Sequence, residues 1–365
     1  MKKLAVVLFN LGGPDSPEAI RPFLFNLFND PAIIGAPKPV RWALAQVISR
    51  RRAPVAREIY ANLDGRSPLL PHTQDQATAL QAALKGAADE VGVFIAMRYW
   101  HPLTAETVKR VKDFGAEKVV LLPLYPQYSS TTSGSSIGEW TREAARQGLT
   151  ADTVSVCCYP TDPGFVRAQA ALLAETLDAL EAERGDLPPP RVLFSAHGLP
   201  KKVIEAGDPY QWQVEQTSAA VAAHLNRPDL DWKVTYQSRV GPLEWIGPAT
   251  DDEIQAAGAE KRPLVVVPIA FVSEHSETLV ELDIEYGELA EQSGVPLYRR
   301  VSTVLSAPPF IEGLAGLVRQ AAASGDTPVS EKGGRLCPGT CGRCPNRTSA
   351  HAHGEAAVAP AQAAL

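Results

Sequence analysis

The run VVVPIAFVSEHSETLVELDIEY, residues 265–286, decides the fold, because it joins a buried strand to a helix within one short stretch. Its first part, residues 265–271, is apolar and rich in valine. Such a run is typical of a strand buried on both faces of a parallel sheet. Residues 273–275 are polar and end the run, and a helix is predicted to follow, starting near the serine that can cap it.

The predicted helix carries three glutamates, Glu277, Glu281 and Glu285, on one stripe. Like charges four residues apart cost a helix about 0.2–0.5 kcal/mol per pair. One interpretation is an ordinary solvated face, where salt screens the repulsion. Apolar residues on both sides of the stripe argue against it, and His275 and Glu277 lie where the strand ends, at the edge that lines the ligand crevice of open α/β sheets. We therefore expect a file of carboxylates that leads a divalent cation to a histidine.

Composition favours a large protein of the cytoplasm. The chain has 365 residues, 45% of them hydrophobic, which is enough for a core divided between two lobes. The net charge is −6 with both signs dispersed, so nucleic-acid binding is not indicated. No apolar run approaches the roughly 18 residues of a membrane span, and the one that follows residues 1–3 is too short for a signal peptide. Five cysteines in such a compartment favour metal or redox use over disulfides.

Short apolar runs alternate with helical patterns along the chain, which predicts parallel βαβ units. The expected strands are residues 4–8, 91–97, 118–122, 154–158, 191–195, 232–236, 264–267 and 296–299. Four precede residue 160 and four follow the proline-rich break at 186–190. The predicted fold is α/β, with two doubly wound lobes (residues 1–160 and 161–330) whose parallel four-stranded sheets face each other across a cleft. A closed eight-stranded barrel is disfavoured by the long insertion after the first strand.

That insertion, residues 19–88, is predicted to form an apolar helical flap that includes the basic triplet Arg50, Arg51 and Arg52. Most of its apolar residues are expected to pack between helices. Because arginine forks match carboxylates, the triplet suits a planar apolar ligand with acidic side groups. It would equally suit an anionic membrane surface.

Polar residues follow several strands, among them Arg98, Tyr99 and His197. A single histidine at a strand end is more often a hydrogen-bonded structural residue than a catalyst. His197 and His275 end two strands of the same lobe with Glu277 nearby, and this combination favours a site.

Seven segments carry a family resemblance: FNLGGP (9–14), MRYWHPL (97–103), LYPQYSSTTSGSS (124–136), LFSAHGLP (193–200), GDPY (207–210), YQSRVGPLEWIGPATDD (236–252) and VPIAFVSEHSETLVELDIEY (267–286). With these motifs the chain resembles ferrochelatases, which insert ferrous iron into a porphyrin in haem synthesis. The resemblance covers about residues 4–317. It implies a chelatase-like fold of two Rossmann-like lobes with the porphyrin between them.

The resemblance also implies roles for individual residues. His197 matches the active-site histidine, His275 with Glu277 the second metal-side pair, and Glu281 with Glu285 an acidic ladder on a helix often distorted to π form. The residues that match porphyrin-binding positions are Arg98 and Tyr99 on the opposite wall, Trp245 in a loop near the macrocycle, Arg52, Tyr60 and Ser67 at the propionates, and Leu11, which replaces a methionine of the animal enzymes.

The chemistry needs two pyrrole protons removed and the water shell of the cation replaced. A neutral imidazole accepts a proton near physiological pH, so His197 suits a general base. Binding the macrocycle bent would store strain of about 1–5 kcal/mol. Whether His197 is base, iron ligand or both stays open, as does whether His275 and Glu277 position iron or remove protons.

Three cysteines near the end of the chain, Cys337, Cys341 and Cys344, have C-x3-C-x2-C spacing amid proline and glycine. A fourth ligand is available at Cys157 or Cys158. Four thiolates suit a [2Fe–2S] cluster or structural zinc. Many ferrochelatases carry such a cluster, so the resemblance favours [2Fe–2S] with Cys158 as the internal ligand. Residues 331–347 are then a cysteine-rich extension, and residues 348–365 are predicted to be disordered, without a role for the two histidines there.

Three functions compete on this basis. The first is ferrochelatase activity that converts protoporphyrin IX and Fe²⁺ to protohaem. The second is a chelatase for coproporphyrin, cobalt or nickel, and the third a non-enzymatic carrier of iron or haem. The acidic file beside a base-competent His197 favours catalysis. Peripheral association with the inner face of a membrane is expected from the apolar substrate, and both a monomer and a homodimer are compatible with the sequence.

Overall fold

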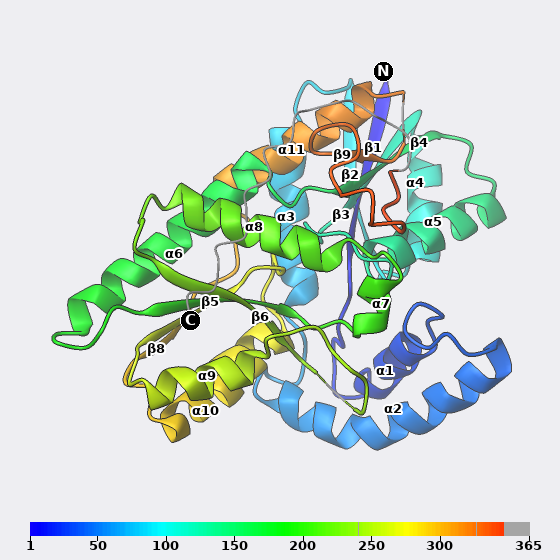
Figure 1. Ribbon diagram of the computed structural model, residues 1–365. Helices are drawn as coiled ribbons and strands as arrows, with labels where there is room; N and C mark the ends of the chain where they lie inside the picture. Colours follow the sequence, from blue (N-terminus) through cyan, green and yellow to red (C-terminus); the bar gives the residue numbers. More distant parts are fainter. Residues whose placement is uncertain (240, 326, 347–365) are drawn as a thin grey trace.

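A computed structural model describes residues 1–239, 241–325 and 327–346, and it has the predicted α/β architecture (Figure 1). The first sheet has the order β2-β1-β3-β4-β9 and the second β6-β5-β7-β8, with all strands parallel. The strands are β1 Lys3–Asn10, β2 Glu90–Met97, β3 Lys118–Pro123, β4 Asp152–Cys158, β5 Arg191–His197, β6 Asp231–Gln237, β7 Leu264–Pro268, β8 Tyr298–Arg300 and β9 Val329–Ser330.

All eight predicted strands are present, most of them as apolar runs that the sheets bury, whereas β8 is a short strand of polar residues at the edge of its sheet. The first sheet has five strands rather than four. The additional strand, β9, is only two residues long, so it shows no alternation that a sequence pattern could reveal, and it joins β4 at a register shift between Val156 and Cys158.

Helices cover the sheets and form the flap. They are α1 Ile20–Phe28, α2 Lys38–Ala61, α3 Leu69–Ala83, α4 Thr104–Phe114, α5 Ser133–Gln147, α6 Pro163–Glu183, α7 Lys201–Glu205, α8 Tyr210–His224, α9 Thr250–Ala259, the π-helix η1 Glu277–Glu285, α10 Tyr286–Ser293 and α11 Pro308–Ala323.

The insertion 19–88 divides into two parts. Helices α1 and α2 pack on each other, with the rings of Phe25 and Trp42 6.5 Å apart, and they lie to one side of the sheets (Figure 1). Helix α3 instead packs on the first sheet, where Leu80 and Leu84 are fully buried. Only α1 and α2 therefore form a projecting flap.

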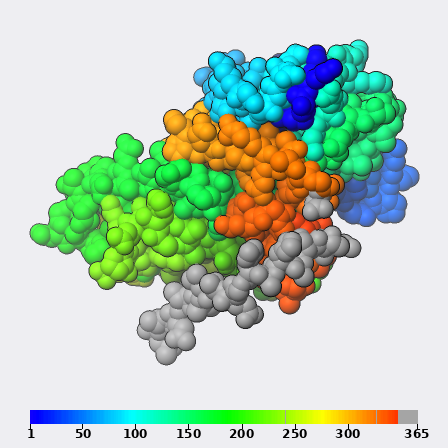
Figure 2. All heavy atoms as spheres, turned by 90° about the horizontal axis from the view of Figure 1, so that it is seen from above, coloured from blue at the N-terminus to red at the C-terminus, as the bar shows by residue number. Residues whose placement is uncertain are grey.

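The end of the described chain returns to the first lobe. Phe310 and Leu314 of α11 belong to the core beneath β1, β3 and β4, and the ring of Phe310 lies 5.8 Å from that of Phe165 in α6. Figure 2 shows the orange and red residues between the cyan first lobe and the green second lobe. Helix α11 and strand β9, which we assigned to the second lobe, thus pack on and join the first sheet.

None of the helices in the described part of the chain combines the length and apolar character that a membrane-spanning segment needs. Residues 348–365, predicted to be disordered, lie outside the described residues, as does Arg347.

Candidate functional site

His197 and Glu277 meet at the carboxyl edge of the second sheet. His197 is the last residue of β5, and Glu277 begins η1 after the neighbouring strand β7. Because parallel neighbours end at the same edge, their following side chains converge there. His197 Nδ1 lies 2.8 Å from Glu277 Oε2, and the side chains are 41% and 24% exposed.

Each of these two groups stabilises the charged form of the other. Burial alone would raise the pKa of the Glu277 carboxyl, but the charge of His197 and the hydrogen bond to it outweigh burial and lower that pKa to about 2. Burial alone would lower the pKa of His197, but the charge of Glu277 and the same hydrogen bond raise it above its ordinary value. A proton that His197 accepts is therefore stabilised by the Glu277 carboxylate.

His275 is a second, more buried imidazole beside the pair. Its Nε2 lies 4.0 Å from Glu277 Oε1, and its ring packs on Phe271 with centroids 4.6 Å apart. Burial lowers the pKa of His275, against the charge of Glu277, so the ring is neutral and keeps a lone pair. Its Nδ1 makes no hydrogen bond of ordinary geometry within the described residues, although the backbone of Ser273 is close enough to act on its pKa.

The glutamates lead from this point to the surface along η1, which is a π-helix, as the resemblance implied. Glu281 accepts hydrogen bonds from Ser238 N at 2.9 Å, Ser238 Oγ at 2.6 Å and Gln237 Nε2 at 3.0 Å. Burial, and then the charge of Glu277, raise the pKa of Glu281. Glu285 is exposed. The file therefore runs from a charged inner carboxylate to solvent.

The loop that carries His275 is fixed by a buried ion pair that the sequence patterns did not single out. Glu274 accepts from Arg300 Nη1 at 2.9 and 3.1 Å and from Thr303 N at 2.9 Å. Arg300 also pairs with Asp283 of η1 at 2.6 Å. Arg300 is the last residue of β8. Its position at the carboxyl edge of the sheet is the sequence feature that could have marked it as part of the site.

Arg98 and Tyr99, at the end of β2, are held by a buried carboxylate that we did not predict. Asp30 is 3% exposed; its Oδ2 lies 2.8 Å from Arg98 Nη2 and accepts from Tyr99 Oη at 2.8 Å and from Ser135 Oγ at 2.6 Å. Burial and the charge of Asp30 raise the pKa of Tyr99. The flap is thereby tied to the first sheet at the residues we expected on its wall.

Most of the other expected porphyrin contacts lie near these groups. Burial raises the pKa of Tyr60 to about 12, and its hydroxyl interacts with Ser276 and with the charge of Glu277. Gly13 lies against Ser67. A Cβ atom at Gly13 would be only 2.4 Å from Ser67 Oγ, and 3.9 Å from Tyr60 Oη, so no larger residue fits there.

Trp245 and Leu11 also border these residues, whereas Arg52 stands apart. Trp245 lies beside Gly198, immediately after His197. The Leu11 carbonyl accepts from Tyr99 N at 3.0 Å. Arg52 is exposed over the Phe28 ring at 6.0 Å, and no hydrogen bond or ion pair joins it to the other expected residues in the described chain.

All five cysteines are buried, in two adjoining groups. Cys337, Cys341 and Cys344 pack together against Trp212. Cys158 lies with Cys157, their Sγ atoms 3.4 Å apart, and the charge of Cys337 reaches Cys158.

The thiols influence one another, but they do not form a metal site as they stand. The hydrogen bond with Cys337 lowers the pKa of the Cys344 thiol to about 6. Across the ranges that the structure describes, no three histidine, cysteine or acidic side chains are arranged to hold a metal ion.

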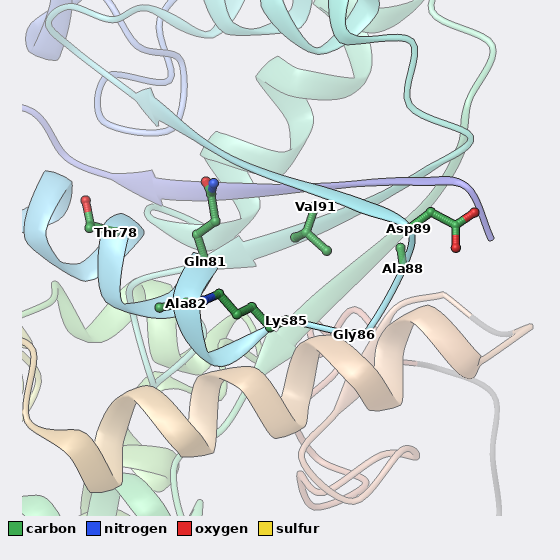
Figure 3. A pocket seen from close by; sticks show the side chains of 8 residues that line it. All are labelled: Thr78, Gln81, Ala82, Lys85, Gly86, Ala88, Asp89 and Val91. Carbon is green, nitrogen blue, oxygen red and sulfur yellow. The ribbon is translucent and has the colours of Figure 1, made fainter.

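A cavity of about 470 Å³ lies elsewhere, between α3 and the amino end of β2 (Figure 3). Its lining includes Gln81, Lys85, Asp89 and Val91. Because the histidines lie at the carboxyl edge of a different sheet, this cavity is unrelated to them.

Comparisons with known proteins point to a single family. A family model described as Ferrochelatase matches residues 3–322. A protein named Ferrochelatase from Caulobacter vibrioides is 55% identical over 353 residues, 96% of this chain and 99% of its own length. One from Phenylobacterium zucineum is also 55% identical, over 94% of this chain and 97% of its own.

One solved structure is similar at the level of the fold. SirB from Bacillus subtilis with Fe³⁺ superimposes with a TM-score of 0.50 at 14% identity, over 88% of this chain and 96% of SirB.

Proposed function

The chain belongs to the ferrochelatase family, and from this premise we propose how its residues insert ferrous iron into a porphyrin. It is a metal chelatase of haem biosynthesis, as the sequence motifs predicted. The observation that carries the assignment of residues is the 2.8 Å contact between His197 Nδ1 and Glu277 Oε2 at the carboxyl edge of the second sheet.

His197 accepts the pyrrole protons. The imidazole is partly exposed, so a macrocycle placed over it can bring a pyrrole nitrogen within hydrogen-bond reach. Each proton taken from a pyrrole N–H makes His197 an imidazolium, which the Glu277 carboxylate stabilises. The proton then leaves through Glu281, whose raised pKa suits it to carry protons, to the exposed Glu285 and solvent.

Ferrous iron, the second substrate, reaches the macrocycle along the same carboxylates, which are ligands it accepts. His275, kept neutral by burial, offers the imidazole nitrogen that replaces water on the arriving cation. The porphyrin lies between Trp245 beside His197 and the wall formed by Leu11, Arg98 and Tyr99. Tyr60, Ser67 and Arg52 hold its propionates.

Anaerobic turnover of protoporphyrin IX with Fe²⁺, compared with coproporphyrin and with Co²⁺, tests this assignment. His197→Ala should abolish insertion at saturating iron. The matched control is His101→Ala, since His101 Nδ1 makes a similar 2.7 Å contact with Glu106 at an exposed site. Near-normal insertion by His197→Ala would overturn the role given to His197, and insertion of cobalt alone would favour the second chelatase function.

We further propose that Cys158, Cys337, Cys341 and Cys344 hold a [2Fe–2S] cluster, with zinc as the alternative. The donor chemistry suits either group, because four thiols are buried here and one already has a lowered pKa; binding would draw them together, since no three of them surround a metal position in the described residues. The cluster would supply a redox-active group that crosslinks the chain end to β4. Visible absorbance that is lost in Cys341→Ser and kept in Cys157→Ser supports it; a colourless protein with bound zinc rejects it.

Peripheral attachment to the cytoplasmic face of a membrane is proposed through α2. Trp42, Val47 and Val55 of this helix are exposed, at 53%, 47% and 55%, beside Arg50 and Arg51. Apolar and cationic side chains on one projecting helix match an anionic lipid surface. Trp42→Ser should weaken binding to vesicles that contain anionic lipid, whereas a serine at exposed Leu243 in the second lobe should not.

A further inference from the structure

Helix α3 connects the porphyrin side of the molecule to the metal side. It begins at Leu69, whose backbone N–H donates to Ser67 Oγ at 3.3 Å. Leu69, Thr73, Gln76 and Leu80 recur at intervals of four, three and four residues, so they share one buried face. On that face Thr73 Oγ1 accepts from Asn10 Nδ2 at 3.2 Å, next to Leu11.

Gln76 makes the contact at the other end. Its side chain is fully buried, and its Nε2 donates to the carbonyls of Val272 and Leu305, both at 3.0 Å. Its Oε1 accepts from Ser273 Oγ at 3.2 Å. Both donor hydrogens of the amide are thus used. Val272 and Ser273 belong to the loop between β7 and η1, three and two residues before His275.

His275 depends on this loop for its position. Its Nδ1 makes no hydrogen bond of ordinary geometry within the described chain, the backbone of Ser273 is close enough to act on its pKa, and its Nε2 is 4.0 Å from Glu277, beyond hydrogen-bond distance. A histidine that binds metal is ordinarily oriented by a hydrogen bond on its other nitrogen. Here the ring is placed by its backbone and by Phe271.

We propose that Gln76 is a positioning residue that sets the place of His275 relative to the porphyrin. This inference rests on the proposed function, in which His275 receives iron. A first-lobe helix that holds Ser67 and Asn10 at one end and the His275 loop at the other fixes the separation of the two substrates. Losing Gln76 removes the two contacts that hold Val272 and Ser273 of this loop, leaves the Glu274–Arg300 pair in place, and touches neither substrate.

The test compares Gln76→Leu with Gln147→Leu. Leucine has a volume close to that of glutamine but makes none of the hydrogen bonds of Gln76 to Val272, Ser273 and Leu305. Gln147 is the control, because its Nε2 also bridges segments far apart in sequence, to the Ala105 carbonyl at 2.9 Å, and does so in the first lobe without a contact to the loop of His275. We expect Gln76→Leu to lower kcat/KM for Fe²⁺ on the order of 10-fold, as loss of an outer partner of a metal ligand does. Porphyrin affinity, measured by fluorescence quenching, should be unchanged, and Gln147→Leu should leave both unchanged.

A double variant separates positioning from a general loss of structure. If Gln76 acts through His275, Gln76→Leu costs nothing further in the residual activity of His275→Ala. Additive losses, or unchanged iron kinetics in Gln76→Leu, would overturn the inference about Gln76. Unchanged iron kinetics in His275→Ala would instead overturn the proposed role of His275.

Discussion

Replacing Glu277 with glutamine should lower the pKa of His197. Glutamine keeps an oxygen that can accept from Nδ1 at 2.8 Å, but it removes the charge that opposes burial. An opposite charge at this distance is worth about one to three pKa units. Because His197 is 41% exposed, solvent screens the charge, and we expect a fall of about one unit. The pKa of His197 therefore falls back toward its ordinary value.

NMR titration of the histidine ring protons measures this directly, with His197 assigned among the seven histidines by a His197→Asn variant. Glu106→Gln is the control, since it removes the carboxylate beside His101 and should leave His197 unchanged. The rate should follow the titration. A proton acceptor works only when neutral, so insertion falls as pH drops through the pKa of His197, and this acid limb should move to lower pH in Glu277→Gln.

Two outcomes would contradict this account. A pKa of His197 that is the same in Glu277→Gln as in the parent protein would mean that Glu277 is not what raises it. An acid limb that stays in place while the titration moves would assign proton acceptance to another group.

Three further results are expected. Denaturant unfolding should show that Glu277→Gln loses most stability between about pH 4.5 and 6.5, because the lowered carboxyl pKa contributes above the first value and the raised imidazole pKa below the second. Glu274→Ala should lower the free energy of unfolding by about 3 kcal/mol, because it leaves the buried Arg300 without this partner. Glu183→Ala removes the exposed pair with Arg299 and should lower it by less than about 1 kcal/mol. Gly164→Ala should destabilise by about 1–3 kcal/mol, because its Cβ would collide with the Pro309 carbonyl oxygen, whereas Gly316→Ala meets nothing and should stabilise by about 0.5–1 kcal/mol.

Much of the fold could be predicted because burial on both faces demands apolar runs, and such runs mark the central strands of both sheets, among them β1, β3, β5 and β7. The convergence of His197 with Glu277 followed from the same logic, since neighbouring parallel strands end at one edge. The cysteine spacing correctly placed three thiols together but did not distinguish Cys157 from Cys158, which are adjacent and equally buried.

Other parts of the site carry no local signal. Asp30 and Gln76 are single polar residues whose partners lie 69 and 196 residues away, so only the folded chain shows what they hold. A helical wheel drawn at 3.6 residues per turn also misplaces side chains on η1. At the end of this helix the backbone N–H of Tyr286 donates to the carbonyl of Glu281, which is five residues back and not four.

Because its turn is wider, η1 contains one residue more than an α-helix would need to join the same two ends. Deleting a single position between Glu277 and Glu281 would let the segment tighten into an α-helix whose two ends stay where they are. Ser238 Oγ, which now reaches Glu281 at 2.6 Å and Glu277 at 3.5 Å, could then no longer serve both carboxylates. A chain shortened in this way should keep its fold and lose its metal-insertion activity. The additional residue of η1 therefore serves the reaction and not the stability of the lobe.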